Sequence, residues 1–237
     1  MTGLTDAGWR AARLALLERE KAHMREADAL AEARRALPPV AVDGSYEFEG
    51  PDGPETLADL FGDHSQLAVY HFMYGADWSE GCPSCSFWGD NLDGIADHLA
   101  ARDVSLVLVG TAPYETLAAY GLRLGWRHRW SSAGESGFSE AFGVRFSAGE
   151  LETKAFQYNF RDGAFGGPEA PGLSTFSKDA DGRIWHHYST YARGLESFNG
   201  AYKLLDLMPK GRDEAGLSFS MAWLKRRDQY DNQTTKT

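Results

Sequence analysis

Cys82 and Cys85 are the only cysteines among the 237 residues of the chain, and together they form one C-x-x-C motif. Residues 67–74, just upstream, are mostly aliphatic or aromatic and predict one buried strand. Downstream, apolar residues recur at helical spacing from Phe87 to Leu99. The motif is therefore predicted to occupy a strand-to-helix turn, with Cys82 as the helix N-cap. Pro83 would fill the first helical position, where its missing N–H is no loss.

A cysteine sulfur at a helix N-cap faces free backbone N–H groups and the positive end of the helix dipole, and both favour the thiolate. The spacing of three residues places the two sulfurs on one face of the helix, close enough to react with each other. Asp77 and Glu80 are near in the sequence and oppose this effect, because a negative charge raises the pKa of a neighbouring thiol. The motif indicates a reversible redox pair.

Composition excludes several kinds of partner. A formal net charge of −10 argues against a nucleic acid or an anionic membrane surface. No stretch approaches 18 consecutive apolar residues, and the first ten residues lack the basic start and apolar run of a signal peptide. We therefore expect a cytoplasmic protein with no nucleic-acid partner and no membrane partner. In a reducing cytoplasm, a lone C-x-x-C motif is more plausibly catalytic or metal-binding than structural.

The chain divides into three predicted segments. In residues 1–39, apolar side chains recur every three or four positions between Arg and Glu, which predicts a long amphipathic helix ended by Pro38 and Pro39. This arm would pack on its own domain or form a homodimer. Residues 40–224 form the main domain. Residues 225–237 are a polar C-terminal tail that we expect to be mobile.

The order of elements in the main domain predicts its fold class. A buried parallel strand at 104–109 and a helix at 113–124 follow the motif helix, and Asp181-Gly182 predicts the turn of a later hairpin. This order is that of an α/β protein with the thioredoxin-like fold: a central mixed sheet flanked by helices, here with a long N-terminal helical extension. The remaining expected elements are a hairpin-like pair at 40–42 and 45–48, a short helix at 56–61, a loop at 157–172, hairpin strands at 173–177 and 183–188, and a closing helix at 195–207.

Pro171 stands just before the first strand of the later hairpin. Thioredoxin-like folds carry a cis-proline at about that place, opposite the cysteine pair. Pro171 is therefore a candidate for that residue, although an ordinary loop proline would read the same way.

Several blocks of the sequence resemble one known family, and the resemblance covers about Leu14 to Tyr230. It is a bacterial family of unknown function, DUF899, whose members are predicted dithiol-disulfide oxidoreductases of the thioredoxin-like superfamily. The resemblance implies that fold and, more weakly, that activity. The blocks that carry it are residues 70–75, 77–78, 81–88, 188–194 and 207–212.

Two enzyme mechanisms can use these residues. In dithiol-disulfide exchange, Cys82 attacks a substrate disulfide and Cys85 resolves the mixed disulfide. In a peroxiredoxin-like thiol peroxidase, the pattern P-x-x-x-[ST]-x-x-C places a hydroxyl beside the reactive cysteine. Here Ser79 stands at the hydroxyl position and Cys82 at the cysteine, but Gly75 replaces the proline.

Two other interpretations stay open. A zinc site would need two ligands besides the cysteines, and none of His71, His98, His186 or His187 has the spacing of a zinc motif. We expect no metal and no cofactor. The last interpretation is a catalytically inactive thioredoxin-like binding module. The partners of an active enzyme would be a disulfide-containing protein or a small thiol, together with an electron donor.

Two residues near the motif are candidate supporting residues. His71 precedes Phe72 at a place where thioredoxins bury an acidic residue, so it could relay the proton of Cys85 or could be a core histidine hydrogen-bonded to the backbone. Trp78 is expected to line a pocket beside the cysteines or to pack in the core.

Overall fold

The computed structural model describes residues 5–42, 45–163 and 165–230. Residues 231–237 of the predicted tail lie outside this part. The chain divides into two compact units, one up to Pro39 and one from Val40 onward.

The first unit is the helix α1, Ala7–Arg35. Asp6 is its N-cap, and the Asp6 carboxylate accepts a hydrogen bond of 2.7 Å from the backbone N–H of Trp9. Arg34 and Arg35 lie in the last turn, where positive charge suits the negative end of the helix dipole. The long N-terminal helix predicted from the sequence is therefore present, and it ends before the proline pair.

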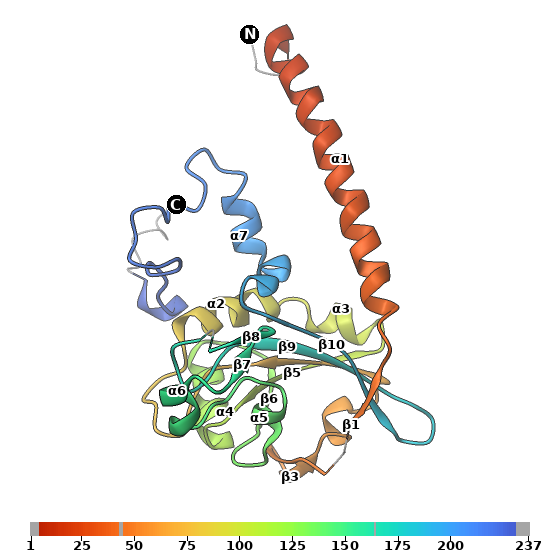
Figure 1. Cartoon of the computed structure of the whole chain (residues 1–237), viewed down its shortest axis with the longest axis vertical. Helices are drawn as coiled ribbons and strands as arrows, with labels where there is room; N and C mark the ends of the chain where they lie inside the picture. Colours follow the sequence, from red (N-terminus) through yellow and green to blue (C-terminus); the bar gives the residue numbers. More distant parts are fainter. Residues whose placement is uncertain (1–4, 43–44, 164, 231–237) are drawn as a thin grey trace. The chain divides into compact units, whose positions relative to one another are not determined.

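The second unit is built on an eight-stranded mixed sheet, whose strands lie in the order β1-β10-β9-β4-β5-β6-β2-β3 (Figure 1). In its centre β4, β5 and β6 run parallel, and β9 pairs antiparallel with β4. The strands are β1 Val40–Val42, β2 Glu47–Gly50, β3 Gly53–Thr56, β4 Gln66–His71, β5 Val104–Gly110, β6 Arg129–Ser132, β9 Gly172–Lys178 and β10 Ile184–Tyr191; β7 Gln157–Tyr158 and β8 Arg161–Asp162 form a separate pair.

Helices and 3-10 turns connect these strands. The helices of the second unit are α2 Pro83–Leu92, α3 Ala96–Ala100, α4 Tyr114–Arg123, α5 Phe138–Ala141, α6 Ala148–Thr153 and α7 Gly200–Leu205, and the 3-10 helices are η2 Asp59–Phe61, η3 Ala192–Phe198 and η4 Arg227–Gln229. The sequence β4-α2-β5-α4, followed by the hairpin β9–β10 and a closing helical segment, is the predicted thioredoxin-like arrangement.

The two faces of the sheet carry separate apolar clusters, because successive residues of a strand point to opposite sides. On one face Tyr70 and Phe72 pack with Trp88 of α2 and Leu117 of α4. On the other, Val69 packs with residues of η2 and α5. Both faces of β4 and β5 are covered, which explains their near-continuous apolar sequences.

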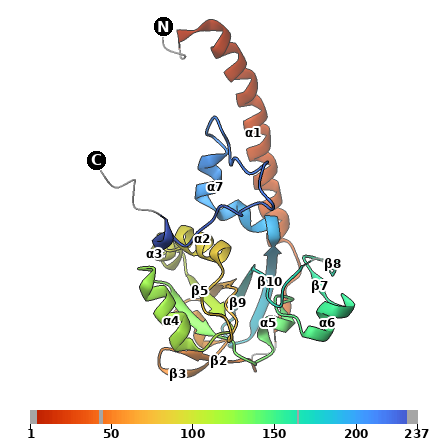
Figure 2. The same ribbon diagram turned by 90° about the vertical axis from the view of Figure 1, so that its left-hand side faces the viewer.

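The closing segment lies against α2 (Figures 1 and 2). The Trp88 indole N–H donates to the Leu195 carbonyl at 2.9 Å, and the backbone N–H of Ala201 donates to the Asn91 side chain at 3.1 Å. The predicted helix at 195–207 is present as η3 and the shorter α7. The helix after the motif is likewise divided into α2 and α3, with Gly94 between them.

The hairpin-like pair expected at 40–42 and 45–48 is wrong. β1 instead joins β10 at one edge of the sheet, where Ala41 pairs with Trp185. β2 pairs with β3 and with β6 at the opposite side. The β2–β3 pairing is a local hairpin, whereas the pairings of β1 with β10 and of β2 with β6 are long-range, so the strand residues alone gave no indication of those partners.

Candidate functional site

Cys82 is the N-cap of α2 and Pro83 is its first residue, as predicted. The Cys82 carbonyl accepts the backbone N–H of Ser86 at 2.9 Å and its hydroxyl at 2.8 Å. The backbone N–H of Cys82 donates to the Met73 carbonyl at 3.0 Å, which ties the start of the helix to the segment that follows β4. The motif is therefore held from both sides at the carboxyl end of a central parallel strand.

The two thiols have opposite environments. Cys82 is half-buried, and its pKa is lowered to about 6, because the Cys85 thiol and the backbone N–H groups of Cys85 and Ser84 stabilise the thiolate. Cys85 is buried, and burial raises its pKa well above the usual range, as does its hydrogen bond with Cys82. At neutral pH the site therefore holds one thiolate and one thiol.

Tyr70, not His71, shares the face of β4 that meets the cysteines. The Tyr70 ring is fully buried in the apolar cluster that contains Cys85. The His71 side chain points to the opposite face, where its Nε2 lies 2.8 Å from the Ser174 hydroxyl and its ring stacks near Phe142. The proposed proton relay through His71 is thereby corrected, because neighbouring residues of a strand face opposite sides. The same alternation, counted from Phe72, could have identified Tyr70.

His71 stays neutral in this environment. Burial lowers its pKa to about 3, and the nearby His186 contributes. A hydrogen-bonded row joins the two histidines, since the hydroxyls of Ser174 and Ser189 are 2.8 Å apart and Ser189 lies 2.8 Å from His186 Nε2. His71 is therefore a core histidine, but its partner is the Ser174 side chain and not the expected backbone group.

Pro171 lies near the motif, lining the same cavity as Ser84 and Cys85. Its peptide bond is trans, since no peptide bond is cis in the part of the chain that the structure describes. The backbone here is held by the Ala170 N–H, which donates to the Val144 carbonyl at 2.8 Å, and by the Tyr158 hydroxyl, which donates to the Pro171 carbonyl at 2.8 Å. The structure therefore places Pro171 beside the cysteines but corrects the cis expectation.

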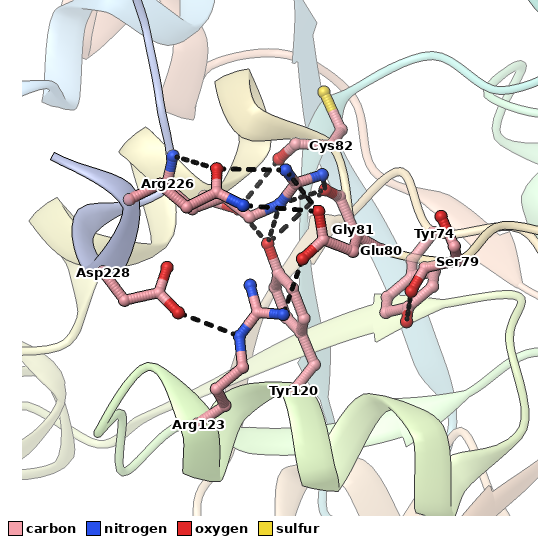
Figure 3. Close-up of polar contacts among 11 residues, drawn as sticks. Tyr74, Ser79, Glu80, Gly81, Cys82, Tyr120, Arg123, Arg226 and Asp228 are labelled. Carbon is pink, nitrogen blue, oxygen red and sulfur yellow. Dashed lines mark hydrogen bonds and ion pairs between the residues drawn. The ribbon is translucent and has the colours of Figure 1, made fainter.

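Trp78 and Ser79 lie on the segment between β4 and α2. Trp78 packs partly buried against the apolar cluster of the motif, with its indole over Gly75. A Cβ at Gly75 would lie 2.9 Å from that indole nitrogen, so a proline could not replace Gly75 unless Trp78 moved. Ser79 is exposed, and Figure 3 shows it beside Tyr74 and away from the Cys82 sulfur. The structure does not bring the Ser79 hydroxyl to the reactive cysteine.

Gly81 precedes Cys82 in a tightly packed position. A Cβ there would lie 2.8 Å from the Phe72 ring and 3.0 Å from the Tyr120 ring. The Gly81 carbonyl accepts hydrogen bonds from the Tyr120 hydroxyl at 3.4 Å and from Arg226 Nε at 3.0 Å. A residue with a side chain would displace these rings, so the position requires glycine.

Arg226 is the residue of this site that the sequence did not indicate, because it lies in the predicted mobile tail. Its guanidinium bonds the Gly81 carbonyl, the Tyr120 hydroxyl at 3.0 Å and the Glu80 carboxylate at 2.7 Å (Figure 3). Arg123 pairs with the other Glu80 oxygen at 2.6 Å and with Asp228 at 3.1 Å. No sequence periodicity marks such an arginine, since its partners Glu80, Gly81 and Tyr120 are more than 100 positions away.

Glu80 therefore does not act on the cysteine as an isolated negative charge. Hydrogen bonds from Arg123 and the charge of Arg226 hold the pKa of Glu80 below its usual range, so it is ionised and compensated. These two cations therefore reduce the effect expected from Glu80, which was to raise the pKa of the Cys82 thiol.

The described residues contain neither a metal-binding cluster nor a membrane-spanning helix. Across residues 5–42, 45–163 and 165–230, no group of three or more His, Cys, Asp or Glu side chains is arranged to hold a metal ion. No helix in the described part has both the length and the apolar character needed to cross a bilayer.

Solved structures with related folds include redox proteins. Peroxidoxin BcpB from Mycobacterium tuberculosis is 17% identical with a TM-score of 0.44, over 66% of this chain and 86% of that one. The C84S mutant of peroxiredoxin Q from Xanthomonas campestris is 15% identical with a TM-score of 0.45, over 72% and 98%. A putative thiol:disulfide interchange protein DsbE from Chlorobium tepidum is 12% identical with a TM-score of 0.36, over 70% and 98%. These identities and TM-scores indicate a related fold and do not show a shared activity.

No curated protein matches the sequence. The family model described as "Bacterial protein of unknown function (DUF899)" matches residues 4–230, so the chain belongs to this family.

Proposed function

We propose that this protein is a dithiol-disulfide oxidoreductase that uses Cys82 and Cys85. One observation carries the proposal: a half-buried Cys82 whose pKa is lowered to about 6 lies one helical turn before a buried Cys85 whose pKa is raised. The first cysteine is a nucleophile at neutral pH, and the second keeps its proton until the mixed disulfide forms.

The reaction balances in two steps. The Cys82 thiolate attacks one sulfur of a substrate disulfide, forms a mixed disulfide and releases the other sulfur as a thiolate, which takes up a proton. Cys85 then loses its proton and attacks Cys82, forming the Cys82–Cys85 disulfide and releasing the second substrate thiol. The substrate gains two electrons and the protein dithiol is oxidised. A second dithiol, the electron donor, reduces the pair again.

The decisive experiment uses the two single variants. Cys85→Ser should accumulate a mixed disulfide on Cys82, because the resolving thiol is absent, and intact-mass spectrometry would detect the added thiol. Cys82→Ser should show no exchange. Thiol titration of the wild type should differ by two thiols per chain between the oxidised and reduced forms. Two thiols that persist under oxidants would contradict the proposal and favour an inactive binding module.

A peroxidase would behave differently in the same variants. Cys85→Ser would still consume one equivalent of peroxide and leave a sulfenic acid, and Ser79→Ala would slow that step. The exposed position of Ser79 and the Trp78 ring packed over Gly75 argue against this outcome. We therefore expect a slow reaction with peroxide that does not depend on Ser79.

A further inference from the structure

A cavity of about 430 Å³ opens beside the cysteine pair, on the side of Cys85 and Ser84. Its volume falls within the range of about 300–1,000 Å³ that is usual for small-molecule sites. The wall is largely aromatic and aliphatic, with Trp88, Tyr158, Phe165 and Leu195 among its residues. The C-terminal part of the chain contributes four further lining residues: Arg212, Glu214, Ser220 and Met221.

The charged side chains of the wall are already bonded to protein groups. Arg212 makes two hydrogen bonds to Asp206, at 2.7 and 2.8 Å, and one to Glu196 at 2.9 Å. Glu196 also pairs with Arg193 at 3.0 Å. One oxygen of Glu214 accepts the Tyr202 hydroxyl at 2.9 Å. Two arginines and two glutamates line the cavity, so their charges balance and favour an uncharged occupant.

Tyr70 lies between Cys85 and this cavity. Its side chain is fully buried and is one of the lining residues, and its hydroxyl interacts with the Cys85 thiol. Burial raises the pKa of Tyr70 well above its usual value, so the hydroxyl keeps its proton. Tyr70 therefore adds a neutral aromatic group to the wall next to Cys85.

We propose that this cavity binds the uncharged aromatic group of a low-molecular-weight disulfide beside Cys85. The reactive role rests on the proposed function, in which Cys82, two residues before the lining residue Ser84, attacks the sulfur nearer to it. Binding itself does not depend on the reaction.

The test separates binding from chemistry. In the Cys82→Ser variant, calorimetric titration with bis(4-hydroxyphenyl) disulfide is compared with bis(4-carboxyphenyl) disulfide, which has the same skeleton and two negative charges. We expect the uncharged compound to bind at least tenfold more tightly than the charged one. Equal binding of both compounds, or no binding of the uncharged one, would overturn the proposal.

A matched pair of variants locates the bound compound. Ser220 lines the cavity and Ser218 does not, and both are exposed in the same segment. Ser220→Trp should reduce binding by tenfold or more, while Ser218→Trp should leave it unchanged. Equal effects would place the ligand elsewhere and contradict the inference.

The reduced wild type then tests the reaction separately. If the uncharged disulfide binds but is not reduced, the cavity assignment holds and the proposed function fails. If the protein reduces glutathione disulfide or a peptide disulfide as fast as the aromatic disulfide, and Ser220→Trp changes none of these rates, the enzyme function holds and the cavity assignment fails.

Discussion

Cys82 and Cys85 have opposite pKa shifts because of their immediate surroundings, although only two residues separate them. Cys82 accepts hydrogen bonds at the start of α2, while Cys85 is enclosed by apolar side chains with the Tyr70 ring nearby. A cysteine exposed to water titrates at about 8.5. The helix start and the side chains around it, including Tyr70 of β4, therefore account for the opposite pKa shifts of the two thiols.

The alkylation of Cys82 should follow its lowered pKa. In reduced protein we expect the rate with iodoacetamide to rise with pH around a midpoint of about 6 and to be nearly constant above pH 7. Mass spectrometry at short times should find the label on Cys82, and Cys82→Ser should remove the fast phase. A midpoint near 8.5 would show that the helix start does not stabilise the thiolate.

His71 should make the fold sensitive to acid. Its pKa is about 3 in the folded state and about 6.5 in an unfolded chain, so below pH 6.5 the unfolded chain binds a proton that the folded chain does not. The contribution of neutral His71 to the free energy of unfolding is therefore fully present above pH 6.5 and is lost progressively as the pH decreases toward 3. Between pH 7 and pH 5 the loss from this residue is about 2 kcal/mol.

Urea unfolding of the wild type and of His71→Gln at both pH values would measure this loss. The variant should be less stable at pH 7, because it disturbs the hydrogen bond with Ser174. Its further decrease at pH 5 should be smaller than that of the wild type by about 2 kcal/mol. An equal decrease in both proteins would mean that His71 is not the acid-sensitive group.

Among the elements, the C-terminal segment Lys225–Tyr230 contributes directly to the site. Arg226 holds the Gly81 carbonyl and the Glu80 carboxylate, just before Cys82, and Asp228 holds Arg123. The polar tail predicted from composition is therefore, up to Tyr230, a segment that packs on the loop between β4 and α2. Composition describes solvation but does not show which polar residues find buried partners.

Arg226→Ala should loosen this loop. We expect a loss of about 1–3 kcal/mol in the free energy of unfolding, because the Glu80 carboxylate and the Gly81 carbonyl lose charged hydrogen-bond donors. The rate of Cys82 alkylation at pH 7 should change as well. Arg227→Ala is the control. Arg227 is half-exposed and forms one long ion pair, of 3.4 Å, with Asp90, so this substitution should change the free energy of unfolding by no more than about 0.5 kcal/mol. Equal effects of the two substitutions would assign no special role to Arg226.

The central elements could be predicted from the sequence because their signals are local. An apolar run, a Cys-Pro helix start and helical spacing lie within 30 residues, and together they predict β4 and α2. The edge strands could not be assigned, since β1 pairs with β10 more than 140 positions away. The same limit applies to the site: Tyr70 could be found by counting along the strand, whereas Arg226 and the cavity depend on tertiary packing.

At the scale of the whole molecule, the second unit brings distant segments to one place. The cavity beside Cys85 takes residues from β4, α2, β7, η3, α7 and the segment 212–221. The first unit contributes a single helix of 29 residues. A single helix has nothing within its own unit on which to pack an apolar stripe, and Trp9, Leu16 and Leu30 belong to that stripe.

The stripe of α1 leads to a prediction about assembly. We propose that two copies of the chain associate through α1, because such a stripe is stabilised by pairing with a second helix. Light scattering should then give twice the chain mass of 26.1 kDa for the full chain, and the single mass for a chain that starts at Pro38. The shorter chain should keep its folded second unit, since that unit has its own apolar clusters.

A matched pair of substitutions shows whether the stripe is responsible. Leu16→Glu with Leu30→Glu places charges in the stripe, and Ala11→Glu with Ala29→Glu adds the same charges on the opposite side of the helix, at about 100° per residue. All four positions are exposed. We expect the first pair to give monomers and the second to leave the dimer intact. A full chain that is monomeric at every concentration, or a dimer that survives both pairs, would show that α1 is not the interface.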